Sequence, residues 1–186
     1  MKKNTFFALI FLLTAFSNAQ AQRHVKGIKQ FNLGGGMTAK GFFAELGYTQ
    51  HLSNKLYIQG SILAEPSSTI KGDVSGSDVK YSSYTLLVQG GYNLWNNQTI
   101  FLNGRAGLAG GIENGKLAEK PTNYIGSDSQ NGFFVAGSIG GEVEIHASDK
   151  FVIAPYFNQF LLGVGGDKFG TARFFAGLSL KFGLNQ

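Results

Sequence analysis

Hydrophobic and polar residues alternate with period two along most of the chain after Arg23. This alternation predicts β-strands, because successive side chains of a strand point to opposite faces. Turn-forming residues separate the alternating segments, and no amphipathic helix interrupts them. We predict eight strands, which cover roughly residues 27–36, 41–50, 55–65, 81–93, 98–112, 132–146, 150–163 and 170–184.

The last segment shows the alternation most clearly. One face carries apolar residues from Ala172 to Leu184, and the other carries Arg173, Ser179 and Lys181. In the segment 132–146, one face is apolar and the other ends in two glutamates and a histidine. The seventh segment contains Pro155, which has no N–H to donate and therefore requires a bulge or a locally unpaired position.

The predicted connections between the strands alternate between short turns and longer loops. Short turns at 51–54, 94–97 and 147–149 alternate with long polar loops at 66–80 and 113–131. Within this part of the chain we interpret the sequence GIENG, residues 111–115, as a turn. Short turns at one end and long loops at the other are typical of membrane barrels. We therefore predict an all-β fold, an eight-stranded antiparallel up-and-down transmembrane β-barrel, as a single domain over residues 22–186.

A barrel in lipid places its apolar face outward and its small or polar face inward. Eight strands leave an interior just wide enough to be filled by side chains. We expect opposite charges to pair there, since an isolated buried charge is costly. The predicted interior charge cluster is a structural plug made of Glu45, Arg105, Glu142, Glu144, Arg173 and Lys181. A proton or ion path through these residues is the alternative.

Aromatic residues support the same orientation. Amphipathic aromatic rings favour the headgroup region of a membrane. We predict such rings near the short-turn ends of the strands, at Tyr48, Tyr57, Tyr92, Trp95 and Phe151.

The first 21 residues read as a secretory signal peptide. Lys2 and Lys3 precede an apolar run from Phe6 to Phe16, and small residues end at Ala21. Such a peptide would direct export of the chain to the outer membrane, and its removal would make Gln22 the mature start. The run is about half the length that a transmembrane helix needs.

Composition narrows the possible chemistry. The chain has no Cys, so disulfides and thiolate metal sites are excluded. The Lys and Arg residues behind the formal charge of +5 are scattered, which argues against direct nucleic-acid binding. Gly110, Gly115 and Lys116 have phosphate-loop spacing, but Leu117 replaces the required Ser or Thr. We predict no catalytic, cofactor-binding or metal-binding residue and no small-molecule substrate.

Several segments resemble, in order along nearly the whole mature chain, the TraO family of Bacteroidetes conjugative transposon proteins. These segments are AQRHVKG, YTLLVQGGYNL, TIFLNGRAGLAGG, NGFFVAGSIGGEVEIHASDKFVI and FFAGLSLKFGL. The resemblance implies an envelope component of a conjugative mating apparatus. It carries no catalytic residues over to this chain.

Three function hypotheses follow from these observations. The first is a non-enzymatic outer-membrane barrel of a conjugation apparatus, with lipid around its wall and protein partners at loops 66–80 and 113–131. The second is a general outer-membrane barrel of adhesin or envelope-stabilising type. The third is an outer-leaflet lipid-modifying enzyme, which would need a catalytic role for His24, His51 or His146.

Overall fold

The computed structural model describes residues 26–71, 78–97, 99–117, 129–164 and 172–184, and all of its regular structure is strand. The strands are β1 (Lys29–Thr38), β2 (Gly41–His51), β3 (Leu56–Lys71), β4 (Asp78–Asn96), β5 (Ile100–Leu117), β6 (Ser129–Ser148), β7 (Phe151–Val164) and β8 (Ala172–Gly183). Among the described residues, no helix is long and apolar enough to cross a membrane.

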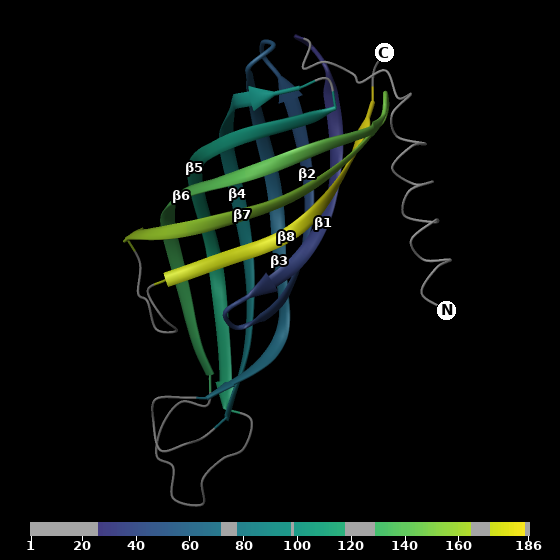
Figure 1. The fold of residues 1–186 in the computed structure, drawn as a ribbon. Helices are drawn as coiled ribbons and strands as arrows, with labels where there is room; N and C mark the ends of the chain where they lie inside the picture. Colours follow the sequence, from purple (N-terminus) through teal and green to yellow (C-terminus); the bar gives the residue numbers. More distant parts are fainter. Residues whose placement is uncertain (1–25, 72–77, 98, 118–128, 165–171, 185–186) are drawn as a thin grey trace, which may run out of the picture.

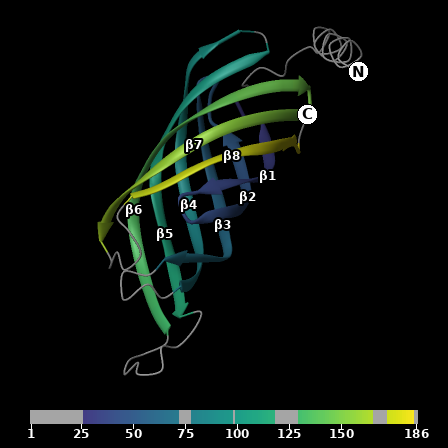
Figure 2. The same ribbon diagram turned by 60° about the horizontal axis from the view of Figure 1, so that its bottom comes forward.

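Each strand pairs with the next, and β1 also pairs with β8, so the sheet closes into a barrel (Figure 1). All eight pairings are antiparallel. Figure 2 shows the same continuous wall from a second direction. The predicted eight-stranded up-and-down barrel is confirmed.

The two faces of the wall differ as the alternation predicts. On β8, Arg173, Ser179 and Lys181 are at most 5% exposed, whereas Phe174 and Leu178 are 45% and 46% exposed. The same division holds on the other strands: the exposed face is rich in Leu, Ile, Val and aromatic residues, and the buried face carries most of the polar side chains. An apolar exterior around a polar interior is the arrangement expected of a barrel in lipid.

The prediction of two long loops is wrong for many of their residues, which form strands. β3 and β4 extend through Lys71 and from Asp78, and β5 and β6 extend through Leu117 and from Ser129. The predicted loops 66–80 and 113–131 therefore consist partly of paired strand. Within these two ranges, residues 72–77 and 118–128 lie outside the described residues. The GIENG sequence is not a turn either, because Gly111–Gly115 pair with both β4 and β6.

The connections define two ends of the barrel. At the short-turn end, His51 and Leu56 bound one tight connection and Ser148 and Phe151 bound another. The first and last strands also meet there, since Leu184 donates a backbone hydrogen bond to Lys29. The long β3–β4 and β5–β6 hairpins project from the opposite end, called the hairpin end below (Figure 1).

Pro155 lies outward on β7 and pairs with Leu178 of β8. On its other side, the β6–β7 ladder has no partner for Val143 or Glu144. The predicted locally unpaired position is therefore present beside the proline, which has no N–H for a ladder bond.

Candidate functional site

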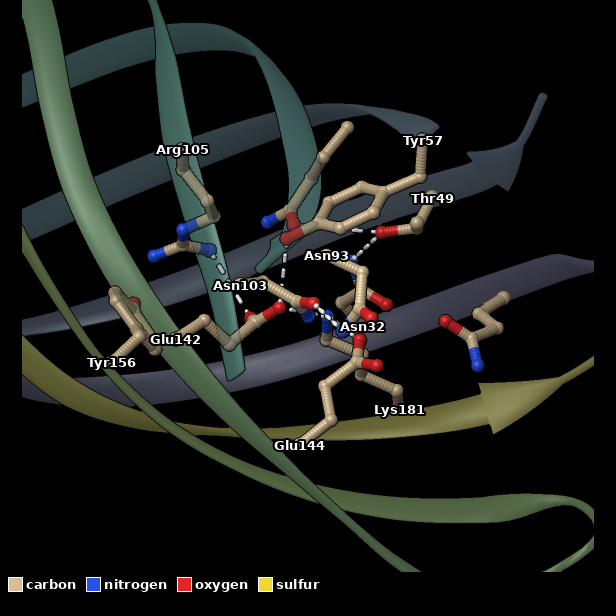
Figure 3. A network of polar contacts seen from close by, with 12 residues as sticks. Asn32, Thr49, Tyr57, Asn93, Asn103, Arg105, Glu142, Glu144, Tyr156 and Lys181 are labelled. Carbon is tan, nitrogen blue, oxygen red and sulfur yellow. Dashed lines mark hydrogen bonds and ion pairs between the residues drawn. The ribbon is translucent and has the colours of Figure 1, made fainter. Parts of the chain in front are cut away.

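The interior charges form two separate groups. The first, called the Glu142 network, consists of Tyr57, Arg105, Glu142, Glu144 and Lys181 (Figure 3). It lies toward the short-turn end, near the last residues of β6 and β8. Lys181 Nζ donates to Glu142 Oε1 at 2.7 Å and to Glu144 Oε1 at 2.6 Å. Arg105 Nη1 donates to Glu142 Oε2 at 3.2 Å. Two cations thus neutralise two carboxylates.

Strand register explains how these residues meet. Glu142 pairs with Asn103 of β5, so Arg105 lies diagonally across from it on the neighbouring strand. Lys181 is two strands away from Glu142, with β7 between them. On β7, Val152 is the cross-strand partner of Lys181. The next inward residue of β7 is Ala154, which is fully buried. A methyl group at this position occupies little of the space between the lysine and the glutamates.

A tyrosine completes the Glu142 network. Tyr57 O–H donates to Glu142 Oε1 at 3.0 Å, and the tyrosine is fully buried. The prediction that Tyr57 lies at the headgroup interface is therefore wrong. Its inward position follows from the period of β3, which places Tyr57 on the same face as Gln59 and Ser61. Tyr48, Tyr92 and Trp95 do face outward, with exposures of 40%, 49% and 55%.

Glu45 is held by neutral donors. Tyr156 O–H donates to its Oε2, and Gln59 Nε2 donates to its Oε1 at 3.1 Å. The Arg105 guanidinium stacks 4.6 Å from the centre of the Tyr156 ring. Glu45 is therefore connected to Arg105 through the tyrosine.

A buried apolar layer fills the barrel beyond the Glu142 network. The rings of Phe43 and Phe160 lie 5.3 Å and 4.7 Å from that of Phe175. The layer consists of Phe43, Leu63, Leu87, Ala109, Phe134, Ala136, Tyr156, Phe160 and Phe175. On β3, β4, β5 and β8 it lies between polar residues: on β5, for example, Ala109 stands between Arg105 and Glu113. The layer therefore divides the interior into two polar compartments.

The second group, called the Arg173 cluster, lies on the hairpin side of this layer and consists of Glu65, Tyr81, Ser83, Glu113 and Arg173. Arg173 forms an ion pair with Glu113. Tyr81 O–H donates to Glu113 Oε1 at 2.8 Å and accepts from Arg173 Nη2 at 2.9 Å. Ser83 Oγ donates to Glu65 Oε2 at 2.5 Å.

The turn between β1 and β2 adds a further cation at the hairpin end. Lys40 places its ammonium group 4.5 Å from the centre of the Tyr81 ring, a cation–π geometry. A small cavity next to the Arg173 cluster is lined by residues that include Thr38, Lys40, Glu65 and Arg173. This end of the interior is therefore polar and less tightly filled than the apolar layer.

All six residues of the predicted interior cluster are buried inside the barrel. The structure brings Arg105, Glu142, Glu144 and Lys181 together, with Glu45 beside them, but it places Arg173 in the other compartment. Two acids of the Arg173 cluster were missed, because Glu113 falls in a predicted loop and Glu65 lies directly before one. A continued odd-numbered inward face along β4 and β5, from Tyr81 to Asn93 and from Glu113 to Phe101, is the signal that could have revealed them.

The structure also places two of the three histidines. His51 and His146 are both buried, and both lie at the short-turn end of their strands. His146 Nε2 lies 3.7 Å from Glu144 Oε2, while His24 lies outside the described residues. Among the described residues, no group of three or more His, Cys, Asp or Glu side chains could hold a metal ion.

Comparisons with known proteins give a fold and no family. No protein-family model matches the chain, and no curated protein does. The N-terminal β-barrel domain of Pseudomonas aeruginosa OprF is similar in structure, with a TM-score of 0.61, 12% identity, and coverage of 86% of this chain and 98% of that domain.

Two further solved structures are similar. Neisserial surface protein A has a TM-score of 0.56 at 8% identity, covering 83% of this chain and 94% of its own. Ail, the attachment invasion locus protein of Yersinia pestis, has a TM-score of 0.53 at 12% identity, covering 86% and 99%. At these identities the similarity shows the shared barrel fold.

Proposed function

We propose that this chain is a non-enzymatic outer-membrane barrel of adhesin or envelope-stabilising type, anchored by its wall and active through its hairpin end. The observation that carries the proposal is the combination of an apolar exterior with an interior that side chains close. A wall that faces hydrocarbon needs lipid around it. Partners then have access to the two ends, and the longest projecting structure is at the hairpin end.

The closed interior argues against a transport function. Apart from the Tyr156 hydroxyl, which already donates to Glu45, the apolar layer offers no polar group to an ion, and the carboxylates on both sides of it are engaged by cations or neutral donors. We expect no measurable conductance from the full chain in a planar lipid bilayer. Replacing Phe160 and Phe175 together by Ala would remove two rings of the layer, and a conductance that appears only in this variant would locate the barrier. Conductance in the unmodified chain would contradict a structural plug.

The positions of the histidines argue against an outer-leaflet enzyme. His51 and His146 are buried at the short-turn end, which is the periplasmic end of a barrel in the expected orientation. An enzyme acting on outer-leaflet lipid needs its catalytic groups at the opposite end. Alanine replacement of both histidines should leave the lipid composition of the outer membrane unchanged, as mass spectrometry of extracted lipids can test.

The structural neighbours support the adhesin or envelope type. One is named as an attachment invasion locus protein and another as a surface protein. The test is a strain that lacks this chain, complemented either with the full chain or with a variant whose β3–β4 hairpin is shortened to a tight turn. Loss of attachment or envelope integrity in the deletion strain and in the shortened variant supports the proposal. Unchanged attachment and integrity in the deletion strain would overturn it.

A role in conjugation is the second candidate, and the ordered resemblance of five segments to the TraO family is the observation that favours it. The partners would then be proteins of the mating apparatus that contact the hairpin end. Transfer frequency in the deletion strain separates the two candidates. A drop in transfer with normal attachment supports conjugation, and normal transfer argues against it.

Export is part of both proposals. Residues 1–21 lie outside the described residues, so the signal peptide rests on the sequence pattern. The intact mass of the chain recovered from the outer-membrane fraction should correspond to residues 22–186. A mass that includes residues 1–21, or recovery in plain buffer without detergent, would contradict the proposed processing or location.

A further inference from the structure

Two lysines face outward side by side on the extended hairpins. Lys80 of β4 and Lys116 of β5 are direct cross-strand partners, and both side chains are exposed. None of the ion pairs among the described residues involves either lysine. Like charges directly opposite each other on a sheet repel. This lysine pair is therefore a position where an external anion would relieve repulsion.

The lysine pair continues the lipid-facing side of the barrel. On β4, Lys80 shares its face with Tyr84 and Leu86, which are 55% and 59% exposed. On β5, Lys116 shares its face with Ile112, which is 50% exposed. The residues between them, such as Tyr81 and Glu113, point inward and are buried. The two ammonium groups therefore belong to the outer wall and lie apart from the Arg173 cluster.

The distance from the apolar band matches the headgroup layer. Outward aromatic residues bound the band on β4 at Tyr84 and at Trp95, and Lys80 lies beyond Tyr84 on the hairpin side. With a rise of about 3.4 Å per residue and a strand tilt of about 40°, Lys80 stands roughly 10 Å past Tyr84 along the membrane normal. The flexible lysine side chains can bend back toward the band. They therefore reach the level where lipid phosphates lie.

The paired positions on the two neighbouring strands add no opposite charge to the lysine pair. The cross-strand partners that flank it are Thr69 of β3 and Ser129 of β6, which are uncharged residue types. One step toward the apolar band, Ser82 of β4 pairs with Asn114 of β5, and both are uncharged residue types. Among these paired positions, the two lysines therefore carry the charge where the strands leave the apolar band.

We propose that Lys80 and Lys116 together bind a phosphate group of a phosphorylated glycolipid headgroup in the outer leaflet. The inference rests on the proposed outer-membrane location. A phosphate monoester carries nearly two negative charges and accepts charge-assisted hydrogen bonds from two ammonium groups at once. Binding would neutralise both lysines and hold the bases of the β3–β4 and β5–β6 hairpins at the membrane surface.

The test uses the full mature chain in phospholipid nanodiscs that contain a small fraction of diphosphoryl lipid A or of its dephosphorylated form. Native mass spectrometry measures which lipid stays bound to the barrel. We expect the unmodified chain to retain the phosphorylated lipid about tenfold better, and the double variant K80Q/K116Q to lose most of this preference. The matched control K55Q/K150Q removes two exposed lysines at the short-turn end and should keep it.

Three results would overturn the inference: equal retention of the two lipids by the unmodified chain, an unchanged preference in K80Q/K116Q, or full displacement of lipid A by millimolar inorganic phosphate, which would make free phosphate the ligand. Heat-modifiable gel mobility shows whether each variant is folded. A chain that does not insert into the bilayer would contradict the proposed function. An inserted chain without phosphate preference would contradict this inference alone.

Discussion

The two interior groups use the same chemistry at different depths. In the Glu142 network, a tyrosine hydroxyl and two cations surround a carboxylate pair, and in the Arg173 cluster a tyrosine hydroxyl and one arginine hold Glu113. They differ in enclosure. The carboxylates Glu142 and Glu113 are each 1% exposed, but Lys181 is fully buried, whereas Arg173 is 5% exposed and borders a cavity. Similar contacts should therefore contribute differently to stability, because a buried charge without its partner cannot recover hydration in the tighter site.

The largest effect is expected at Lys181. Replacing it with Met removes the cation that bridges Glu142 and Glu144 in a fully buried site, while Arg105 still donates to Glu142. We expect the free energy of unfolding to fall by about 3–5 kcal/mol, as when one member of a buried ion pair is lost. Urea unfolding of the barrel in detergent micelles or lipid vesicles measures this loss.

A second substitution separates lost charge balance from lost packing. Combining Lys181→Met with Glu144→Gln removes one of the two negative charges and should restore part of the stability. If the double variant is no more stable than Lys181→Met, the loss comes from packing and the electrostatic account of the Glu142 network is wrong.

The next effect tests the wall that encloses both groups. Leu178 precedes Ser179 on β8 and is 46% exposed on the outer face. Leu178→Arg would place a charge in hydrocarbon and should lower the free energy of unfolding by about 2–4 kcal/mol. Unfolding in lipid vesicles measures the change, and Leu178→Ile is a control that keeps an apolar side chain. Equal stability of the Arg and Ile variants would mean that this face does not contact lipid.

The surroundings of the barrel wall explain which inward and outward faces could be predicted from the sequence. Within the apolar band, lipid on one side and a crowded interior on the other force alternation, so the faces of β6 and β8 were predicted correctly down to Glu142, Glu144 and Lys181. Beyond the band, both sides of a strand can be polar. Hydrophobic and polar residues then no longer alternate along the sequence, although the side chains of Ser83 and Glu113 still point inward.

Other residues were missed for local reasons. Gly111 and Gly115 made the region of Glu113 look like a turn, yet both pair within strands. A Cβ at Gly111 would collide with the backbone oxygen of Tyr84 and the ring of Phe134, so glycine there makes room for the apolar layer. Tyr57 was misplaced because its residue type suits a membrane interface as well as an interior hydrogen bond. Ion-pair partners across the barrel depend on register, which composition does not determine.

A smaller loss is expected in the Arg173 cluster. Arg173→Met removes the ion pair with Glu113, but Tyr81 can still donate to that carboxylate, and the adjoining cavity allows solvent to approach. We expect a decrease of about 1–3 kcal/mol in the free energy of unfolding. The measurement is the same urea titration that is used for Lys181→Met. A loss as large as that of Lys181→Met would show that enclosure does not distinguish the two groups.

Two serines give the smallest and most closely matched test. Ser83 and Ser179 are equally buried, but Ser83 Oγ donates to Glu65 at 2.5 Å, while Ser179 Oγ has no hydrogen-bond partner among the described residues. Ser83→Ala should lower the free energy of unfolding by about 1–2 kcal/mol, and Ser179→Ala by less than about 0.5 kcal/mol. The two substitutions remove the same atom, so their difference in urea unfolding reports the Glu65 hydrogen bond rather than lost volume. Equal effects would mean that Glu65 is stabilised by other contacts and that Ser83 contributes only packing to the Arg173 cluster.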